Sequence, residues 1–302
     1  MGKVWPKLLL LILPLIFWRW SYSESGLWWA ESWSSVPGVM ASLYLLYCGV
    51  FIYCRLFFFA SVALIICLLF SIRILPDIRT QAQACGKTFK ILQYNILFEN
   101  KKIDNLIQFV KKERPDLIVL QEMTPRHGAA LQGLHELYPY RYGGQPKVGY
   151  PSNQFILSRQ PLYGMSVFRT DDDQSLIRGF WQPTPDVDIA LFTAHPPSPR
   201  GQQLWHRRNL MFQTVTFLTG FVPVENTLVI GDFNLSSDSA RYQQLFPGFS
   251  SLPVSSWPAI SFFPAVGIDH LWIRGSARLC AREAVTQVEG SDHWPVLTHL
   301  GI

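Results

Sequence analysis

The chain has 302 residues, of which 49% are hydrophobic and 16% are charged, and its formal net charge at pH 7 is +5. This charged fraction is low for a soluble globular protein, and the apolar excess lies in residues 1–80, where six Lys and Arg stand against three Asp and Glu. The other 222 residues carry 20 Lys and Arg and 18 Asp and Glu, so their net charge of +2 offers no strong electrostatic surface for duplex DNA.

Three apolar runs, at residues 4–20, 39–54 and 56–75, are near or just under the length that crosses a bilayer. Arg55 separates the second and third runs, which predicts a tight hairpin. Tryptophans gather at the ends of the first run, as in an aromatic belt: Trp18, Trp20, Trp28, Trp29 and Trp33. A cleaved signal peptide is the alternative for this run, but small cleavage-site residues are missing and more apolar runs follow. A buried pair of core helices would be hard to cover, so residues 1–76 are predicted to anchor the chain through about three transmembrane helices.

The charges near these runs bear on the orientation. Lys3 and Lys7 favour a cytoplasmic N-terminus, and three spans then place the C-terminal domain outside, in a periplasm-like space. Basic residues after the third run argue for the opposite side: Arg73, Arg79, Lys87 and Lys90. The expected side is outside, with the alternative open.

The five cysteines divide between the two parts of the chain. Cys48, Cys54 and Cys67 lie in apolar runs and are expected to behave as small hydrophobic residues. Cys85 and Cys280 have no CxxC spacing, which argues against a structural zinc site. A disulfide between them requires an oxidising compartment, and the sequence leaves this pairing open.

After a linker at residues 77–87, residues 88–302 form a second domain of alternating strands and helices. Helices are predicted from residue 103 to before Pro115, at 125–137, at 201–218 and near 239–246. Strands are predicted at residues 89–96, 116–122, 155–158, 175–182, 188–195, 227–231, 268–273, 284–288 and 291–298. This order indicates an α/β or α+β domain.

Several of these strands end in a residue that can bind a metal or carry a proton: Asn95, Glu122, His195, Asp232 with Asn234, and Asp292 with His293. Asp269 lies near the start of its strand, as a neighbouring antiparallel strand requires. Each has an ordinary alternative, since Glu122 can serve a helix N-terminus, His195 a satisfied core position and the Gly231–Asn234 segment a turn. Together they predict a site for a hard divalent cation such as Mg²⁺.

Six short blocks carry a resemblance to a known family: Gln93-Tyr-Asn95, Leu120-Gln-Glu122, Thr193-Ala-His195, Gly231-Asp-Phe-Asn234, Ile268-Asp-His270 and Ser291-Asp-His293. In this order, over about residues 88–300, they resemble the endonuclease/exonuclease/phosphatase superfamily. The resemblance implies a four-layer α/β sandwich of two packed mixed β-sheets flanked by helices, here preceded by the transmembrane segment. The anchor is similar to those of bacterial membrane-bound members, which implies the inner membrane. With the orientation expected from the flanking charges, the catalytic domain would lie on the periplasmic side.

The resemblance also implies site roles. Glu122 is the main ligand of Mg²⁺ (or Mn²⁺), with Asn95 and Asp292 nearby. Asp232 orients or deprotonates the attacking water, and Asn234 holds the phosphate or that water.

The remaining roles concern the phosphate and the leaving group. His293 contacts a phosphoryl oxygen and is polarised by Asp269, while His195 assists the leaving group. Asn153 matches a phosphate-side asparagine weakly, and Tyr150 is the nearest candidate for a mid-domain tyrosine. Arg207 and Arg208 could touch phosphate, but an exposed helix face is the favoured interpretation.

The implied function is a membrane-anchored, divalent-metal-dependent phosphoesterase that cleaves a phosphodiester or phosphomonoester by in-line attack of a metal- and Asp232-activated water. The alternatives are a deoxyribonuclease-like endonuclease on nucleic acid, a sphingomyelinase-like lipid phosphodiesterase, and a catalytically silent membrane-tethered binding domain. Expected partners are the phosphate ester and the lipid bilayer, with no obligate protein partner. Gly-x-Ser-x-Gly, Walker and His-Glu-x-x-His motifs are all missing, which leaves serine hydrolases, nucleotide triphosphatases and zincins without support.

Overall fold

A computed structural model describes residues 4–23, 26–73, 79–81, 85–86, 88–260 and 265–302. Parts of two predicted segments lie outside the described residues: 74–75 of the third apolar run, and 77–78, 82–84 and 87 of the linker. The chain divides into two compact units. Unit 1 comprises Met1–Pro76 with the short segments Leu235–Gln244 and Pro264–Val266, and unit 2 comprises the rest.

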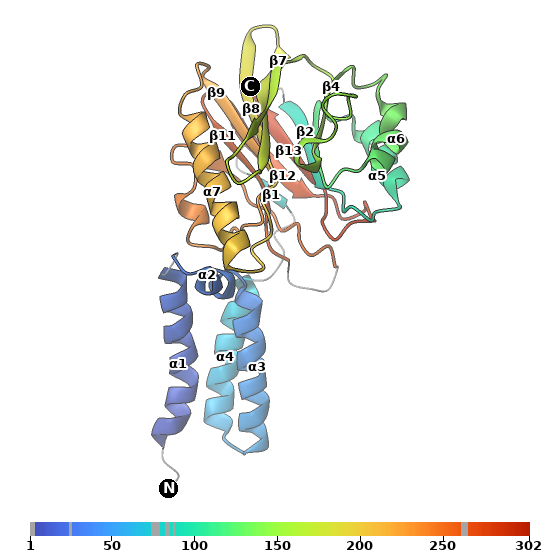
Figure 1. The fold of residues 1–302 in the computed structure, drawn as a ribbon. Coiled ribbons are helices and arrows are strands. Elements are labelled where there is room, and N and C mark those ends of the chain that lie inside the picture. Colours follow the sequence, from blue (N-terminus) through green and yellow to red (C-terminus); the bar gives the residue numbers. More distant parts are fainter. Residues whose placement is uncertain (1–3, 24–25, 74–78, 82–84, 87, 261–264) are drawn as a thin grey trace. The chain divides into compact units, whose positions relative to one another are not determined.

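Unit 1 is built on four helices: α1 (Val4–Ser23), α2 (Trp28–Ser34), α3 (Pro37–Tyr53) and α4 (Phe57–Arg73) (Figure 1). The predicted hairpin between the second and third runs is confirmed, because α3 and α4 pack against each other and the chain turns at Arg55, whose φ is 57°. The buried Tyr44 of α3 donates its hydroxyl hydrogen to the carbonyl of Leu11 in α1. Glu31 of α2 forms a buried ion pair with Arg241 at 2.8 Å, which holds the segment Leu235–Gln244 in this unit.

By length and hydropathy, α1 is able to cross a membrane, with 20 residues and a mean hydropathy of 1.3. The pair α2 and α3, bent by 67°, passes the same criterion only when taken together, and α4 is a shorter apolar helix. Large apolar side chains remain exposed on the outer faces of α3 and α4, among them Leu45, Leu46, Phe57, Phe58, Leu69 and Ile72. The positions of the apolar helices follow the predicted runs, while the number of spans stays a prediction.

Unit 2 contains two mixed β-sheets. In sheet order, the seven-stranded sheet consists of β1 (Arg79–Gln81), β12 (Arg278–Ala284), β13 (Val296–Gly301), β2 (Thr88–Asn95), β3 (Leu117–Gln121), β5 (Phe155–Ser158) and β4 (Tyr140–Tyr142). The six-stranded sheet consists of β10 (Ser250–Ser251), β11 (Asp269–Arg274), β9 (Asn226–Asp232), β8 (Val187–Ala194), β7 (Ser175–Thr184) and β6 (Leu162–Arg169). The pairs β2–β3 and β8–β9 are parallel, and the other neighbours are antiparallel.

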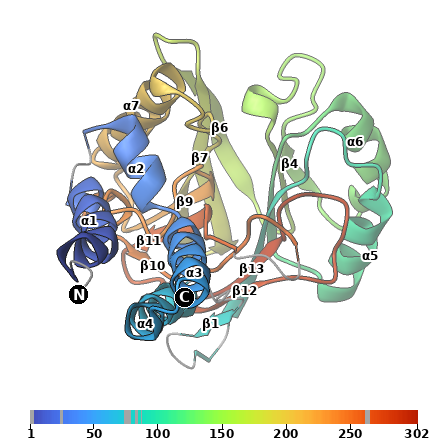
Figure 2. The same ribbon diagram turned by 90° about the horizontal axis from the view of Figure 1, so that it is seen from below.

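Helices cover the outer faces of both sheets (Figure 2). On the seven-stranded sheet, α5 (Ile103–Glu113), α6 (Pro125–Ala130) and the 3₁₀ helix η1 (Leu131–Leu134) share a hydrophobic core with β2 and β3. On the other sheet lies α7 (Gln202–Thr219), whose Phe212 contacts Phe233 after β9. Two mixed sheets flanked by helices confirm the predicted fold.

The sheets pack through their inner faces. Because side chains alternate along a strand, Ile91, Val119 and Ile156 of the seven-stranded sheet face Leu191 and Leu228 of the other in one buried cluster. At one end of the strands this apolar layer gives way to polar residues. The polar residues at this end therefore lie directly above the buried apolar core between the two sheets.

The expected elements differ from the observed ones in three places. The predicted helix 125–137 is a short α6 followed by η1, because Gly128 and Gly133 weaken the helix. The predicted strand 284–288 starts where β12 ends, and 291–295 forms a loop before β13, so Asp292 and His293 precede a strand instead of ending one. The short helix near 239–246 is only η3 (Tyr242–Gln244).

The strands that were not predicted lie at or next to sheet edges: β1, β4, β6 and β10. Such strands bury little of their surface, so their sequences lack a strong apolar pattern. β6 illustrates this, because all eight of its residues are exposed or half-buried.

The open question of the cysteines is resolved by a disulfide between Cys85 and Cys280, with Cα atoms 5.9 Å apart. Cys85 precedes β2 and Cys280 lies in β12, so the bridge passes over β13, the strand between them. Gly301 of β13 makes room for it, because a Cβ there would lie 3.0 and 3.1 Å from the two sulfurs. The bridge joins residues 195 positions apart in the sequence.

Candidate active site

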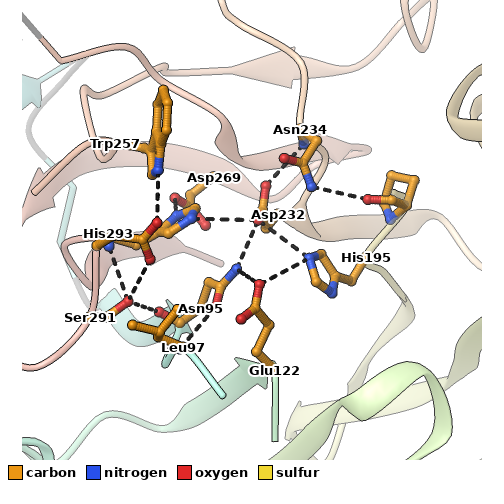
Figure 3. Close-up of polar contacts among 12 residues, drawn as sticks. Asn95, Leu97, Glu122, His195, Asp232, Asn234, Trp257, Asp269, Ser291 and His293 are labelled. Carbon is orange, nitrogen blue, oxygen red and sulfur yellow. Dashed lines mark hydrogen bonds and ion pairs between the residues drawn. The ribbon is translucent and has the colours of Figure 1, made fainter. Parts of the chain in front are cut away.

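The polar residues predicted at strand ends meet at one end of the sandwich (Figure 3). The parallel pair β2 and β3 brings Asn95 beside Gln121, and Glu122 follows. In the other sheet, Asp232 of β9 is the register partner of Asp269 in the antiparallel β11. The predicted position of Asp269 at the start of its strand is therefore confirmed.

Asp232 is the hub of this cluster and is 1% exposed. Its Oδ1 accepts a hydrogen bond from the Asn234 backbone N–H at 2.9 Å, and its Oδ2 accepts one from Asn95 Nδ2 at 3.0 Å. The same Oδ2 lies 3.5 Å from His195 Nε2 and 3.8 Å from His293 Nε2. Burial alone would raise the pKa of Asp232, but the hydrogen bond from His195 and the charge of His293 hold it well below its ordinary value. Asp232 is therefore a carboxylate at neutral pH.

His293 and Asp269 form a buried pair. His293 Nδ1 lies 2.7 Å from Asp269 Oδ2, and Gln93 Nε2 donates to Asp269 Oδ1 at 3.1 Å. Burial would lower the pKa of His293, but the carboxylates, Asp269 first, outweigh it and raise this pKa to about 10. His293 is therefore an imidazolium whose ring orientation is fixed by Asp269, and its Nε2 points toward Asp232.

His195 lies on the other side of Asp232. Its Nε2 is also 3.9 Å from Glu122 Oε1. Burial would lower the pKa of His195, but the hydrogen bond to Asp232 and the charges of Asp232 and Glu122 raise it above its ordinary value. The cluster thus places two imidazole Nε2 atoms against one carboxylate oxygen.

Three of the predicted site residues have left-handed backbone conformations: Glu122 with φ 57°, Asn153 with φ 54° and Asn234 with φ 49°. A glutamate rarely adopts this conformation, which costs free energy and is concentrated at functional sites. It directs Glu122 toward Asn95, whose Nδ2 donates to Glu122 Oε1 at 2.9 Å. Gly231 is required for a different reason, because a Cβ there would overlap the Ala194 carbonyl oxygen.

Arg208 corrects a sequence expectation. It is 2% exposed, so it lies neither on an exposed helix face nor in contact with solvent phosphate. Its Nη1 donates to the Asn234 carbonyl at 2.9 Å, while Asn234 Nδ2 donates to the Pro196 carbonyl at 3.0 Å. Arg207 pairs instead with Asp172 at 3.2 Å. Nothing in the sequence distinguishes Arg208 from the half-buried Arg207; the difference is that Arg208 lies on the buried face of α7.

Asp292 lies at the open side of the cluster. The preceding Ser291 donates its hydroxyl to the Asn95 carbonyl at 2.8 Å, which places this loop beside β2. Trp257 Nε1 donates to Asp292 Oδ2 at 3.1 Å, a contact that no motif predicts. The structure thus brings Asp292 to the rim and the other predicted acids to the floor.

Asn153 and Tyr150 lie further out. Asn153 closes the 3₁₀ helix η2 (Pro151–Asn153), its carbonyl accepts from Met123 N–H at 2.8 Å, and its side chain is exposed. Tyr150 packs edge-on against Phe155 and lines two cavities, of about 620 and 660 Å³, rather than joining the polar cluster.

The cluster suits a divalent cation. Four carboxylates, from Glu122, Asp232, Asp269 and Asp292, gather with two imidazoles, and Asp232, Asp269 and His293 have ligand atoms within 4.8 Å of one another. Those three are already hydrogen-bonded or paired among themselves, whereas Glu122 and Asp292 are more open. Carboxylate oxygens are the ligands that Mg²⁺ prefers. Asn95 turns its Nδ2 to the carboxylates and its Oδ1 to Leu97 N–H, so an amide rotation of about 180° would offer the oxygen instead.

Comparisons with known proteins identify one matching family and several solved structures of similar fold. The family described as the Endonuclease/Exonuclease/phosphatase family matches residues 92–293. A structure of humanized D. rerio TDP2 is 15% identical, covers 72% of this chain and all of its own, and superposes with a TM-score of 0.61. Beta toxin from Staphylococcus aureus with bound magnesium ions is 14% identical, with 70% and 99% of the chains covered and a TM-score of 0.57. D. rerio TDP2 complexed with a single-strand DNA product gives 16% identity, 72% and 100% coverage and a TM-score of 0.60. No curated protein matches the sequence.

Proposed function

The chain belongs to the endonuclease/exonuclease/phosphatase family, and from this premise we propose that it hydrolyses a phosphate ester with the help of a divalent metal ion. One observation carries the proposal: Asp232 stands between two imidazoles, with the half-buried Glu122 and the exposed Asp292 in the same cluster. The bound Mg²⁺ or Mn²⁺, held by Glu122 and Asp292 with Asn95, would neutralise charge on the phosphate.

His293 stabilises the charge that develops on the phosphoryl oxygens. Because its pKa is raised to about 10, the ring is protonated at neutral pH and offers Nε2–H to an equatorial oxygen. Asp269 holds Nδ1 at 2.7 Å and so fixes the ring orientation. Gln93 in turn holds the Asp269 carboxylate.

Asp232 acts on the attacking water. Its lowered pKa makes it a weak base, so it orients the water by accepting a hydrogen bond rather than by removing a proton early in the reaction. Asn234 is held by two hydrogen bonds, because its backbone N–H donates to Asp232 Oδ1 and its side-chain Nδ2 donates to the Pro196 carbonyl. These bonds fix its Oδ1, which offers a second acceptor to the water. His195, with a raised pKa, holds a proton that it donates to the leaving oxygen.

The first prediction tests the metal. Full-length protein purified in detergent is expected to hydrolyse bis(p-nitrophenyl) phosphate, to lose this activity in EDTA and to regain it with Mg²⁺ or Mn²⁺. The physical reason is that four carboxylates repel an anionic ester unless a cation offsets them. Release of p-nitrophenolate at fixed ionic strength measures the effect. Activity that persists after exhaustive chelation would rule out the metal-dependent mechanism, and its complete absence with every divalent cation would favour the silent binding domain.

Two substrate classes remain open, and a specific observation favours each. The likeness to TDP2 bound to a single-strand DNA product favours nucleic acid. The exposed apolar helices of unit 1 favour a lipid head group, because a membrane-tethered domain meets lipids at high local concentration. Parallel assays on a single-stranded oligonucleotide and on phospholipid vesicles separate the two, since only one is expected to be cleaved at a rate comparable with the small diester.

We further propose that unit 1 anchors the chain in a membrane with the catalytic domain on the outer, periplasm-like side. The Cys85–Cys280 disulfide supports this side, because disulfides persist in oxidising compartments.

A reporter fusion checks this second prediction. Alkaline phosphatase fused after Ile302 is expected to be active in a bacterial host, and green fluorescent protein at the same position to be dark, since each folds on only one side of the inner membrane. The opposite pattern would place the domain in the cytoplasm.

A further inference from the structure

Trp257 is unusual among the tryptophans of unit 2. Four of the five, Trp181, Trp205, Trp272 and Trp294, are buried, whereas Trp257 is 38% exposed. It lies in the loop between β10 and β11, at the rim of the polar cluster (Figure 3). Burial in the core therefore does not account for it.

This tryptophan is held in place rather than loose. On one side of it the Ser256 carbonyl accepts from Trp294 N–H at 2.8 Å, and on the other Ala259 N–H donates to the Asp292 carbonyl at 2.7 Å. Ser256 Oγ also accepts from Asp269 N–H at 3.4 Å. The loop is thus tied to the segment that carries Asp292 and His293 and to the start of β11.

The indole presents two different groups to the site. Its Nε1–H donates to Asp292 Oδ2 at 3.1 Å, which fixes the rotation of that carboxylate. Its ring remains partly open to solvent, and the half-buried Pro258 and the 55% exposed Ile260 extend the apolar rim. An indole with its N–H engaged and its ring open is suited to binding an apolar group.

We propose that Trp257 both positions Asp292 and contacts the substrate, and that the substrate is a phosphate diester whose non-leaving group is flat and apolar and is attached close to the phosphate. The inference rests on the proposed function and adds a substrate class to it. The N–H orients Asp292 toward the cation site, as partners of metal ligands commonly do. The ring stacks on the apolar group of the ester while His293 and Asp232 act on its phosphate.

Two substitutions separate these roles. Trp257→Phe keeps an aromatic ring and removes the N–H, whereas Trp257→Ala removes both. Phe221→Ala is the matched control, because Phe221 is an exposed aromatic residue, 73% accessible, in the turn after α7. Two diesters with the same leaving group report on the ring: p-nitrophenyl phenyl phosphate and p-nitrophenyl methyl phosphate. Mn²⁺ affinity, measured by electron paramagnetic resonance without substrate, reports on Asp292.

The expected results are distinct. Both Trp257 variants bind Mn²⁺ about tenfold more weakly, because a lost partner of a metal ligand typically costs 10–100-fold. The preference in kcat/KM for the phenyl over the methyl ester falls about tenfold in Trp257→Ala and is largely kept in Trp257→Phe. Phe221→Ala changes neither quantity.

Each role can be overturned separately. Unchanged Mn²⁺ affinity in Trp257→Phe would overturn the positioning of Asp292. An equal loss on both esters in Trp257→Ala, or the same shift in Phe221→Ala, would overturn the ring contact. The proposed function itself would fail if the wild-type chain hydrolysed neither ester and bound no Mn²⁺. That outcome is read from the wild-type protein, whereas the roles of Trp257 are read from differences between the variants and wild type.

Discussion

Replacing Asp232 by asparagine is expected to lower kcat for bis(p-nitrophenyl) phosphate by about 10³-fold or more, with the fold retained. The Asp232 carboxylate accepts from Asn234 N–H and Asn95 Nδ2 and faces both imidazoles. Asparagine offers one oxygen and an NH₂ group, so it cannot accept on both sides. The water then loses its acceptor, His195 loses the carboxylate that chiefly raises its pKa, and His293 loses one of the charges that raise its pKa beside that of Asp269. Contributions of 10²–10⁴-fold are typical of each such group.

Asp188→Asn is the matched control for this substitution. Asp188 lies at the opposite end of β8 and accepts from Gln182 Nε2 at 3.0 Å, so the same chemical change is made in the same sheet away from the cluster. Its kcat is expected to stay within about twofold of wild type, as for most surface substitutions. Near-UV circular dichroism verifies that both variants fold. An Asp232→Asn protein with more than a tenth of wild-type kcat would contradict the role assigned to Asp232.

Loss of the Cys85–Cys280 disulfide is expected to reduce the free energy of unfolding of unit 2 by about 3–5 kcal/mol. The bridge restricts the unfolded chain strongly because its cysteines are 195 residues apart, and the entropy that it removes grows with loop length. It also fastens the segment before β2 to β12, across β13. Urea unfolding of Cys85→Ala/Cys280→Ala in detergent, followed by the fluorescence of unit 2, measures the loss.

Thiol labelling provides the control for this experiment. Denatured wild-type protein is expected to label at Cys48, Cys54 and Cys67 alone, and also at Cys85 and Cys280 after reduction. Reduction is expected to lower the stability of wild type to that of the double variant and to leave the variant unchanged. Labelling of Cys85 and Cys280 before reduction, or equal urea midpoints for both proteins, would contradict the prediction.

The family blocks were recognisable in the sequence because four of the six combine a buried strand with a polar end. Apolar runs predicted β2, β3, β8, β9 and β11, and the parallel pairs then bring their ends to one edge. The position of Asp269 at the start of an antiparallel strand was predicted, and the observed register sets it opposite Asp232. The catalytic and metal-binding roles of these residues remain predictions for the experiments above.

Elsewhere the local sequence was insufficient. Edge strands such as β6 carry no strong pattern, and the segment of Asp292 and His293 proved to be a loop before β13. Arg208 looked like an exposed cation next to Arg207, yet it is buried and holds the Asn234 carbonyl. Periodicity indicates which residues share a face, but not how deeply that face is covered.

By itself, the sequence determined the apolar N-terminal helices, the strands of the core and the set of groups available for chemistry, because these depend on residue type and spacing. The tertiary structure alone decided which groups meet. It paired Cys85 with Cys280, set Asp269 against His293 and so raised the pKa of that imidazole to about 10, and placed the Trp257 indole on Asp292. Burial and the distance between partners govern each of these outcomes, and both arise only when strands far apart in the sequence pack together.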